Sequence, residues 1–177
     1  MIFFASDFHL GHENISKYCG RPFTTLKEMD ETIIKNINDT VDENDTLFFL
    51  GDFCMKKSSE ASNAPKDSYE YYRNQIKCKN IVFIRGNHDH NNLTKTIIES
   101  VVIEHGGKRI FMTHDPKFAK KEFTWNFCGH THGKYGKFVK MTHKSIIVDL
   151  SVENWEYRPV SINDILQAHA YWSKVKK

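Results

Sequence analysis

The hydrophobic positions of the chain fall into short runs, separated by segments with helical spacing. The short runs predict buried strands at residues 2–5, 46–50, 81–84, 101–103, 109–112, 125–128 and 145–148. The helical spacing predicts helices at residues 25–37, 67–77, 91–98 and from Ser161 towards the end of the chain. Gly106-Gly107 lies between two runs and predicts a hairpin, whereas residues 56–65, rich in Ser, Lys and Asn, predict a loop.

The order of these elements predicts the fold class. The first half of the chain alternates strand and helix, and the second half is mostly strand. Such an order indicates an α/β protein in layers, with sheets inside and helices outside. No linker interrupts the pattern, so residues 1–177 are predicted to form one domain.

Composition excludes several classes of protein. Hydrophobic residues make up 40% and charged residues 27%, as in ordinary globular proteins, and the net charge of +3 is too small to favour a nucleic-acid partner. No segment approaches the roughly 20 apolar residues that span a membrane. The four cysteines form no C-x-x-C pair, which disfavours a structural zinc site. We therefore expect a cytoplasmic protein with reduced thiols.

Polar residues follow the ends of successive predicted strands. They are Asp7, Asp52, Asn87, His114 and His130. In layered α/β folds, ligands bind at the carboxyl edge of the sheet. Five polar residues at such positions predict a functional site there.

Two of these residues begin short motifs, Asp7-x-His9 and His130-x-His132. Residues i and i+2 at a strand end point the same way, so each motif is expected to direct two side chains towards one ion. Hard oxygen ligands combined with imidazoles are typical of a two-metal hydrolytic site. Glycines precede three of the ligands and leave room for a sharp turn: Gly51, Gly86 and Gly129.

The ordered set of motifs resembles the calcineurin-like metallophosphoesterases. The motifs are Asp7-x-His9, Gly51-Asp52, Gly86-Asn87-His88-Asp89, His114 and Gly129-His130-x-His132. Residues 8–15 and 19–23 resemble those of small bacterial and phage members of the family. The resemblance implies a four-layer α-β-β-α sandwich of two mixed sheets flanked by helices.

The resemblance also implies a ligand set for two divalent cations. Asp7, His9 and His132 would hold one cation, and Asn87, His114 and His130 the other, with Asp52 bridging them. Mn²⁺ is the expected metal, while Fe²⁺, Zn²⁺, Co²⁺ and Ni²⁺ also suit such a mixed site.

Four further residues are candidates for catalysis and substrate binding. By the resemblance, His88 would be the general acid for the leaving oxygen, and Asp89 would orient its imidazole and keep it protonated. Arg85 resembles the phosphate-binding arginine of members that carry R-G-N-H, and His12 is a candidate substrate contact. Arg21 is either a second phosphate contact or a surface residue beside a turn.

These residues predict a hydrolase of phosphoester bonds, in which a hydroxide between the two metals attacks phosphorus. A small or nucleotide-like phosphodiester is the favoured substrate, because the chain has little length for a cap over the site. The alternatives are a phosphomonoesterase acting on nucleotides or proteins, a nuclease of the same family and, least favoured, a non-catalytic binding module. A glycosidase using Asp7 and Asp52 would leave the histidines unexplained.

Overall fold

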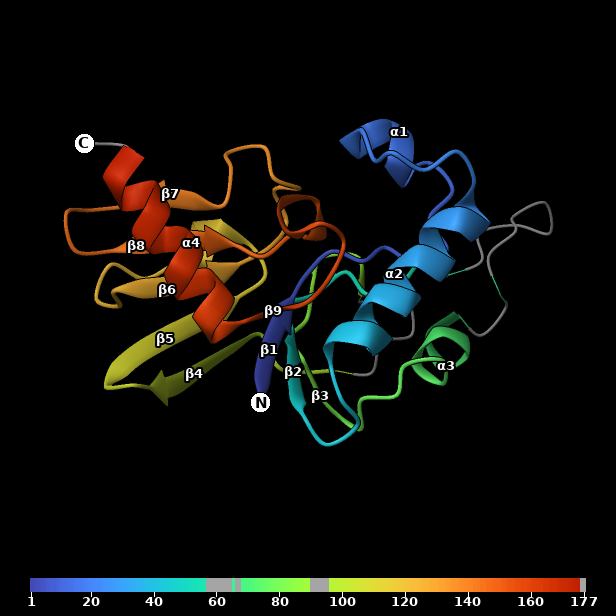
Figure 1. The fold of residues 1–177 in the computed structure, drawn as a ribbon, viewed down its shortest axis with the longest axis horizontal. Coiled ribbons are helices and arrows are strands. Elements are labelled where there is room, and N and C mark those ends of the chain that lie inside the picture. The colour runs from blue at the N-terminus through green and yellow to red at the C-terminus, as the bar shows by residue number, and fades with distance from the viewer. Residues whose placement is uncertain (57–64, 66–67, 90–95, 176–177) are drawn as a thin grey trace.

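The computed structural model describes residues 1–56, 65, 68–89 and 96–175, and it is built on two mixed sheets (Figure 1). The first sheet has the order β3-β2-β1-β9. Its strands are β1 (Ile2–Ala5), β2 (Thr46–Phe49), β3 (Asn80–Phe83) and β9 (Val160–Ser161). β1, β2 and β3 run parallel, and β9 pairs with β1 in the antiparallel sense.

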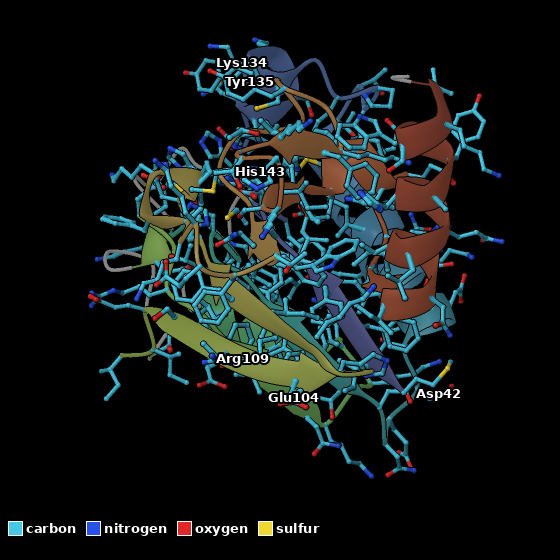
Figure 2. The ribbon with its side chains drawn as sticks, turned by 90° about the vertical axis from the view of Figure 1, so that its left-hand side faces the viewer. Asp42, Glu104, Arg109, Lys134, Tyr135 and His143 are labelled. Atoms are coloured by element: carbon cyan, nitrogen blue, oxygen red, sulfur yellow. The ribbon has the colours of Figure 1, made fainter. Side chains whose placement is uncertain are left out.

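The second sheet has the order β4-β5-β6-β8-β7. Its strands are β4 (Ser100–His105), β5 (Lys108–Thr113), β6 (Trp125–Cys128), β7 (Phe138–Lys140) and β8 (Ile146–Asp149). The predicted hairpin is confirmed as β4 and β5, which pair Glu104 with Arg109 near the turn (Figure 2). β5, β6 and β8 run parallel, so their carboxyl ends share one edge.

The helices are α1 (Ile15–Cys19), α2 (Leu26–Thr40), α3 (Ser68–Arg73) and α4 (Ile162–Val175), with short 3-10 helices at Pro116–Phe118 and Val152–Trp155. α2 begins where the Thr25 hydroxyl accepts a hydrogen bond from the Glu28 amide at 3.1 Å. It buries Met29, Ile33 and Ile37, the face that the spacing predicts.

Alternation along the strands divides the hydrophobic core into two parts. Phe3 and Ala5 face the part beneath α2 and α3, whereas Phe4 faces the second sheet. The Phe4 ring lies edge-on to Phe127, with 5.0 Å between the centroids. α4 packs on the second sheet through His169, whose ring lies 4.9 Å from Trp125. The predicted α/β fold of two mixed sheets flanked by helices is confirmed.

Several short elements were not predicted: α1, β7 and β9 are five residues long or shorter. The predicted loop at 56–65 and the predicted helix at 91–98 lie mostly outside the described residues. Single-domain organisation over 1–177 stays a prediction. Cys54 and Cys128 are buried and free, as expected. In the described ranges, every helix is too short or too polar to cross a bilayer.

Candidate metal centre

The polar residues predicted at the strand ends come together at one edge of the two sheets. Asp7, Asp52 and Asn87 follow the parallel strands β1, β2 and β3 of the first sheet. His114 and His130 follow β5 and β6, which are parallel in the second sheet. The carboxyl ends of both sets of strands therefore supply one cluster.

One group of side chains consists of Asp7, His9 and His132. The Nε2 atoms of His9 and His132 lie 3.8 Å and 3.9 Å from Asp7 Oδ1. Ligands of one ion at about 2.1 Å are themselves separated by about 3–4 Å. Asp7 Oδ1 and His9 Nε2 are buried and have no hydrogen-bond partner among the described residues. Buried polar atoms without hydrogen-bond partners are suited to binding a cation.

A second group lies beside the first. Asn87 Oδ1 lies 2.9 Å from both His114 Nε2 and His130 Nδ1. Asp52, His114 and His130 also place ligand atoms within 4.8 Å of one another. An amide oxygen, a carboxylate and two imidazoles match the chemistry of a divalent transition-metal site.

Asp52 stands between the two groups. Its Oδ2 atom lies 3.5 Å from His9 Nε2 and 3.4 Å from His114 Nε2. Its Oδ1 atom accepts a hydrogen bond from the His88 amide at 2.9 Å. One carboxylate oxygen is thus held by the protein, which leaves the other facing both candidate ion positions.

The two carboxylate oxygens of Asp7 also have different roles. Asp7 Oδ2 accepts hydrogen bonds from the His130 amide at 2.8 Å and the Ser151 hydroxyl at 3.1 Å. Asp7 Oδ1 is the oxygen left without a partner. The protein therefore orients both carboxylates before any ion binds.

The backbone at the ligand positions differs from the predicted geometry. Alternation along a strand was expected to direct the two side chains of each motif towards one ion. Asp7 and His9 do fall in one ligand group, whereas His130 and His132 fall in different groups, so the expectation was wrong for the second motif. Five non-glycine ligands instead have left-handed φ values: Asp7 at 60°, His9 at 51°, Asp52 at 60°, His130 at 71° and His132 at 49°. Such residues typically cost about 1–3 kcal/mol each and gather at functional sites.

Glycines allow the close packing around these carboxylates. A Cβ atom at Gly86 would lie 2.2 Å from Asp52 Oδ1, and one at Gly129 would lie 2.4 Å from Asp7 Oδ2. No side chain fits at such distances, so glycine is required at both positions for the close approach of these carboxylates.

Burial and charge shift the protonation of the ligands in the metal-free protein. Burial alone would raise the pKa of Asp7, but its interaction with His9 and the nearby imidazoles hold it well below the ordinary value. Burial lowers the pKa of His114, but Asp52 and Asp7 together raise it to about 9. Because an imidazole must be neutral to bind a metal, protons and cations compete for this centre.

His88 and Arg85 lie at the rim of the centre. His88 is exposed, and its ring centroid lies 5.6 Å from that of His9. Arg85 is partly exposed and forms an ion pair with Glu99. A phosphate that binds Arg85 would compete with this carboxylate.

Asp89 has other partners than the resemblance implies. Its Oδ2 atom accepts hydrogen bonds from the Gly86 and Asp52 amides at 2.8 Å and 2.9 Å, and its Oδ1 atom accepts one from Phe53 at 3.1 Å. The described contacts of this buried carboxylate are thus with backbone, and they join the loops that carry Asp52 and Asn87.

The remaining described histidines lie either beside the centre or outside it. His12 is half-buried beside the centre, 5.7 Å from the His9 ring, and burial together with the neighbouring imidazoles lowers its pKa to about 4. It stays a candidate substrate contact. His105 and His143 are exposed outside the centre, and His169 packs against Trp125 (Figure 2 labels His143).

Arg21 corrects both interpretations of that residue. Its side chain is buried and donates hydrogen bonds to the Asp7 carbonyl at 2.7 Å and the Phe8 carbonyl at 2.8 Å. It also donates to Glu153 Oε1, from Nε at 2.9 Å. Arg21 is therefore neither a surface residue nor available to a phosphate, because its donors hold the loop of the first motif.

Glu153 is a residue that the sequence analysis missed. Its Oε1 atom lies 2.9 Å from His132 Nδ1, on the far side of the ring from the candidate ion. A carboxylate at this position fixes the tautomer of a metal-ligating histidine and the direction of its free nitrogen. Asp149 is the last residue of β8, and Ser151 and Glu153 come shortly after it. The strand-end rule that found the ligands would have found them too.

Glu153→Ala is expected to weaken metal binding by about 10–100-fold, because His132 loses its support. It should also lower the free energy of unfolding by about 3–5 kcal/mol, since the Arg21 guanidinium is left buried without a counter-ion. Glu153→Gln keeps a hydrogen-bond acceptor for His132, so it should recover metal affinity. It should not recover the free energy of unfolding, because its amide carries no charge to pair with Arg21. Competition with a chelator and urea denaturation measure the two effects.

Glu31→Ala is the matched control, because Glu31 is exposed and its pair with Lys27, at 3.7 Å, lies on the surface. Equal metal affinity in Glu153→Ala and the wild type would contradict the assigned role of Glu153.

The comparison with protein families decides where the chain belongs. The profile of the calcineurin-like phosphoesterase superfamily domain matches residues 1–148. The chain belongs to this superfamily. The sequence resemblance is thereby confirmed, and so is the expectation of a metal-dependent phosphoesterase at the level of the family.

One relative and one solved structure extend the likeness over nearly the whole chain. An uncharacterised protein of Methanocaldococcus jannaschii is 36% identical over 171 residues, which are 94% of this chain and 89% of that protein. A crystal structure from Aquifex aeolicus, of a protein of unknown function, has a TM-score of 0.65 at 22% identity and covers 95% of this chain and 98% of its own. An archaeal phosphodiesterase has a TM-score of 0.46 at 15% identity, over 87% of this chain and 86% of that one.

Proposed function

We propose that this phosphoesterase hydrolyses small, nucleotide-like phosphodiesters with two divalent cations, Mn²⁺ being the preferred metal. The observation that carries the proposal is the position of Asp52 Oδ2, 3.5 Å from His9 Nε2 and 3.4 Å from His114 Nε2. This oxygen faces two ligand groups at once, as a bridging carboxylate must. Asp7 Oδ1 and His9 Nε2, buried without partners among the described residues, add support.

The ligand residues divide between two ions. Asp7, His9 and His132 would hold the first, and Asn87, His114 and His130 the second. Two divalent ions at such a site, when bound, lower the pKa of a water molecule and offset the charge of the phosphate oxygens. The chain itself holds its carboxylates in place through Asp52 Oδ1 and Asp7 Oδ2.

His88 is proposed to donate the proton to the leaving oxygen. Its side chain is exposed, its backbone amide donates to Asp52 Oδ1, and its ring centroid lies 5.6 Å from that of His9, so the imidazole lies at the rim of the centre. General acid catalysis of this kind typically contributes about 10²–10⁴-fold in rate.

Arg85 is proposed to bind the phosphate. Its guanidinium pairs with Glu99, so the phosphate of a substrate must displace the Glu99 carboxylate from the guanidinium. A planar guanidinium suits this exchange, since it can donate two parallel hydrogen bonds. His12, at 5.7 Å from the His9 ring, is the second candidate contact.

A phosphodiester is the proposed substrate, as the sequence analysis expects. A phosphomonoesterase is the alternative within the same site. A nuclease for polymeric nucleic acid is less favoured, because a net charge of +3 offers little to a phosphate backbone.

The test is hydrolysis of bis-p-nitrophenyl phosphate and p-nitrophenyl phosphate by protein stripped of metal with a chelator. We expect no turnover until Mn²⁺ is restored, and then faster cleavage of the diester. Faster cleavage of the monoester would favour a phosphatase. Absence of turnover with Mn²⁺, Fe²⁺, Zn²⁺, Co²⁺ and Ni²⁺ would refute the proposed activity.

A further inference from the structure

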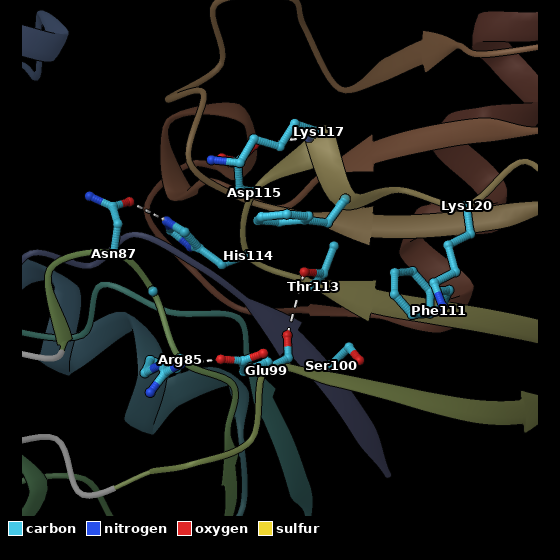
Figure 3. Close-up of a pocket in the computed structure, with 12 residues that line it drawn as sticks. Arg85, Asn87, Glu99, Ser100, Phe111, Thr113, His114, Asp115, Lys117 and Lys120 are labelled. Atoms are coloured by element: carbon cyan, nitrogen blue, oxygen red, sulfur yellow. Dashed lines mark hydrogen bonds and ion pairs between the residues drawn. The ribbon is translucent and has the colours of Figure 1, made fainter.

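A cavity of about 390 Å³ opens directly beside the candidate metal centre (Figure 3). Its walls come from the loop after β3, the start of β4, the end of β5 and the 3-10 helix Pro116–Phe118. Asn87 and His114 belong both to the wall and to the second ligand group. Ligand pockets typically measure about 300–1,000 Å³, so the cavity suits a group attached to a phosphate at the centre.

The cavity combines aromatic rings with cationic side chains. Phe118 is 59% exposed, with Lys117 Nζ 4.8 Å from its ring centroid. Phe111 forms a buried part of the wall, and Lys120 Nζ lies 5.0 Å from its centroid. An exposed aromatic ring beside lysines is a surface on which planar, electron-rich or anionic groups bind.

Hydrogen bonds hold this wall in place. The Asp115 carboxylate accepts from the Lys117 amide at 2.9 Å and pairs with Lys117 Nζ at 2.6 Å. The fully buried Asn126 side chain accepts from the Lys120 amide at 2.7 Å and donates to the Lys120 carbonyl at 3.1 Å. Both ends of the segment that carries Phe118 are therefore anchored, so the backbone beneath the ring is held in place before a ligand arrives.

The cavity adjoins the second ligand group, whereas the proposed acid lies beside the first. Its described wall includes Asn87 and His114 of the second ligand group, and neither His88 nor His9 is part of it. The His88 ring is instead next to that of His9, at 5.6 Å. The leaving group must approach His88, so the cavity is left to the second ester group, which stays on the phosphate.

We propose that this cavity binds a nucleoside as the retained group of the phosphodiester, with its base stacked on Phe118. The inference rests on the proposed function and specifies its substrate class. When a phosphomonoester is the substrate, its single ester group is the leaving group and must approach His88, so the cavity would not contribute to its hydrolysis. The same cavity thus gives a reason for the diester preference.

Two substrates with the same leaving group test the inference: p-nitrophenyl thymidine 5′-phosphate and methyl p-nitrophenyl phosphate. Both release p-nitrophenolate, and only the retained group differs. The wild type is expected to cleave the thymidine ester with a kcat/KM about tenfold higher than that for the methyl ester. The stacking of one base on an aromatic ring can provide a difference of this size. Phe118→Ala should reduce this ratio towards one, mainly through KM, and Phe118→Tyr should keep it.

Tyr171→Ala is the matched control, because Tyr171 is an exposed aromatic residue on α4, away from the cavity. It should leave the ratio unchanged. The second readout is the dissociation constant of thymidine 5′-monophosphate from the Mn²⁺-loaded protein, measured by calorimetry. Phe118→Ala should weaken this binding about tenfold.

The outcomes separate the two proposals. Hydrolysis of both esters at equal kcat/KM, with the same ratio in Phe118→Ala, would overturn the nucleoside cavity and leave the phosphodiesterase standing. Hydrolysis of neither ester would overturn the proposed function, on which the cavity inference depends.

Discussion

Asp52→Asn is expected to lower kcat/KM by about 10³-fold and to release at least one of the two metals. Asp52 uses one oxygen to accept from the His88 amide and turns the other towards both ligand groups. An asparagine has a single oxygen, so it can keep one of these two roles. The loss of bridging charge corresponds to several kcal/mol of transition-state stabilisation, of which about 4 kcal/mol gives 10³-fold.

Elemental analysis of the purified protein, together with kcat/KM for bis-p-nitrophenyl phosphate, measures this effect. Asp39→Asn serves as the control, because Asp39 is exposed on α2 and pairs with Lys35 on the surface. A variant at Asp52 that retained two metals per chain and nearly full activity would show that this carboxylate does not bridge.

His88→Ala is expected to lower kcat by about 10²–10⁴-fold while both metals stay bound. The loss should depend on the leaving group. An alkoxide needs a proton to depart, whereas p-nitrophenolate is stable without one, so alkyl esters should suffer more than p-nitrophenyl esters. The dependence of kcat on the leaving-group pKa, measured over a series of esters, distinguishes an acid from a residue that only binds substrate.

His143→Ala is the control for this series, since His143 is exposed and lies outside the centre. A loss in His88→Ala that is equal for every leaving group would assign His88 to substrate binding. Loss of metal from the variant would make it a structural residue of the centre.

Much of the fold could be predicted because its strands are short apolar runs that end at polar residues. Leu47 and Phe49 lie in such a run, and Asp52 follows it. The parallel order of the strands then brings the ends together. By contrast, β9 has two residues and α1 has five, too few for any periodicity to register.

The supporting contacts could not be predicted in the same way. Arg21 and Glu153 are 132 positions apart, and nothing in either local sequence indicates that they meet. Charged residues are mostly exposed, so a buried arginine is the less expected outcome at any single position. The partners of Asp89 were missed for a related reason. They are backbone amides, which every residue except proline carries, so the sequence does not indicate which of them a carboxylate will bind.

The left-handed backbone at the ligand positions has a consequence for evolution. His9 and His132 occupy conformations that glycine would adopt at no steric cost. Selection for stability alone would thus favour glycine or asparagine where chemistry demands histidine. A descendant of this chain that no longer needs to turn over substrate would be free to drift towards those residues, gaining a sturdier fold as its ligands disappear. Histidine at these two positions is therefore expected to persist only while selection acts on the site.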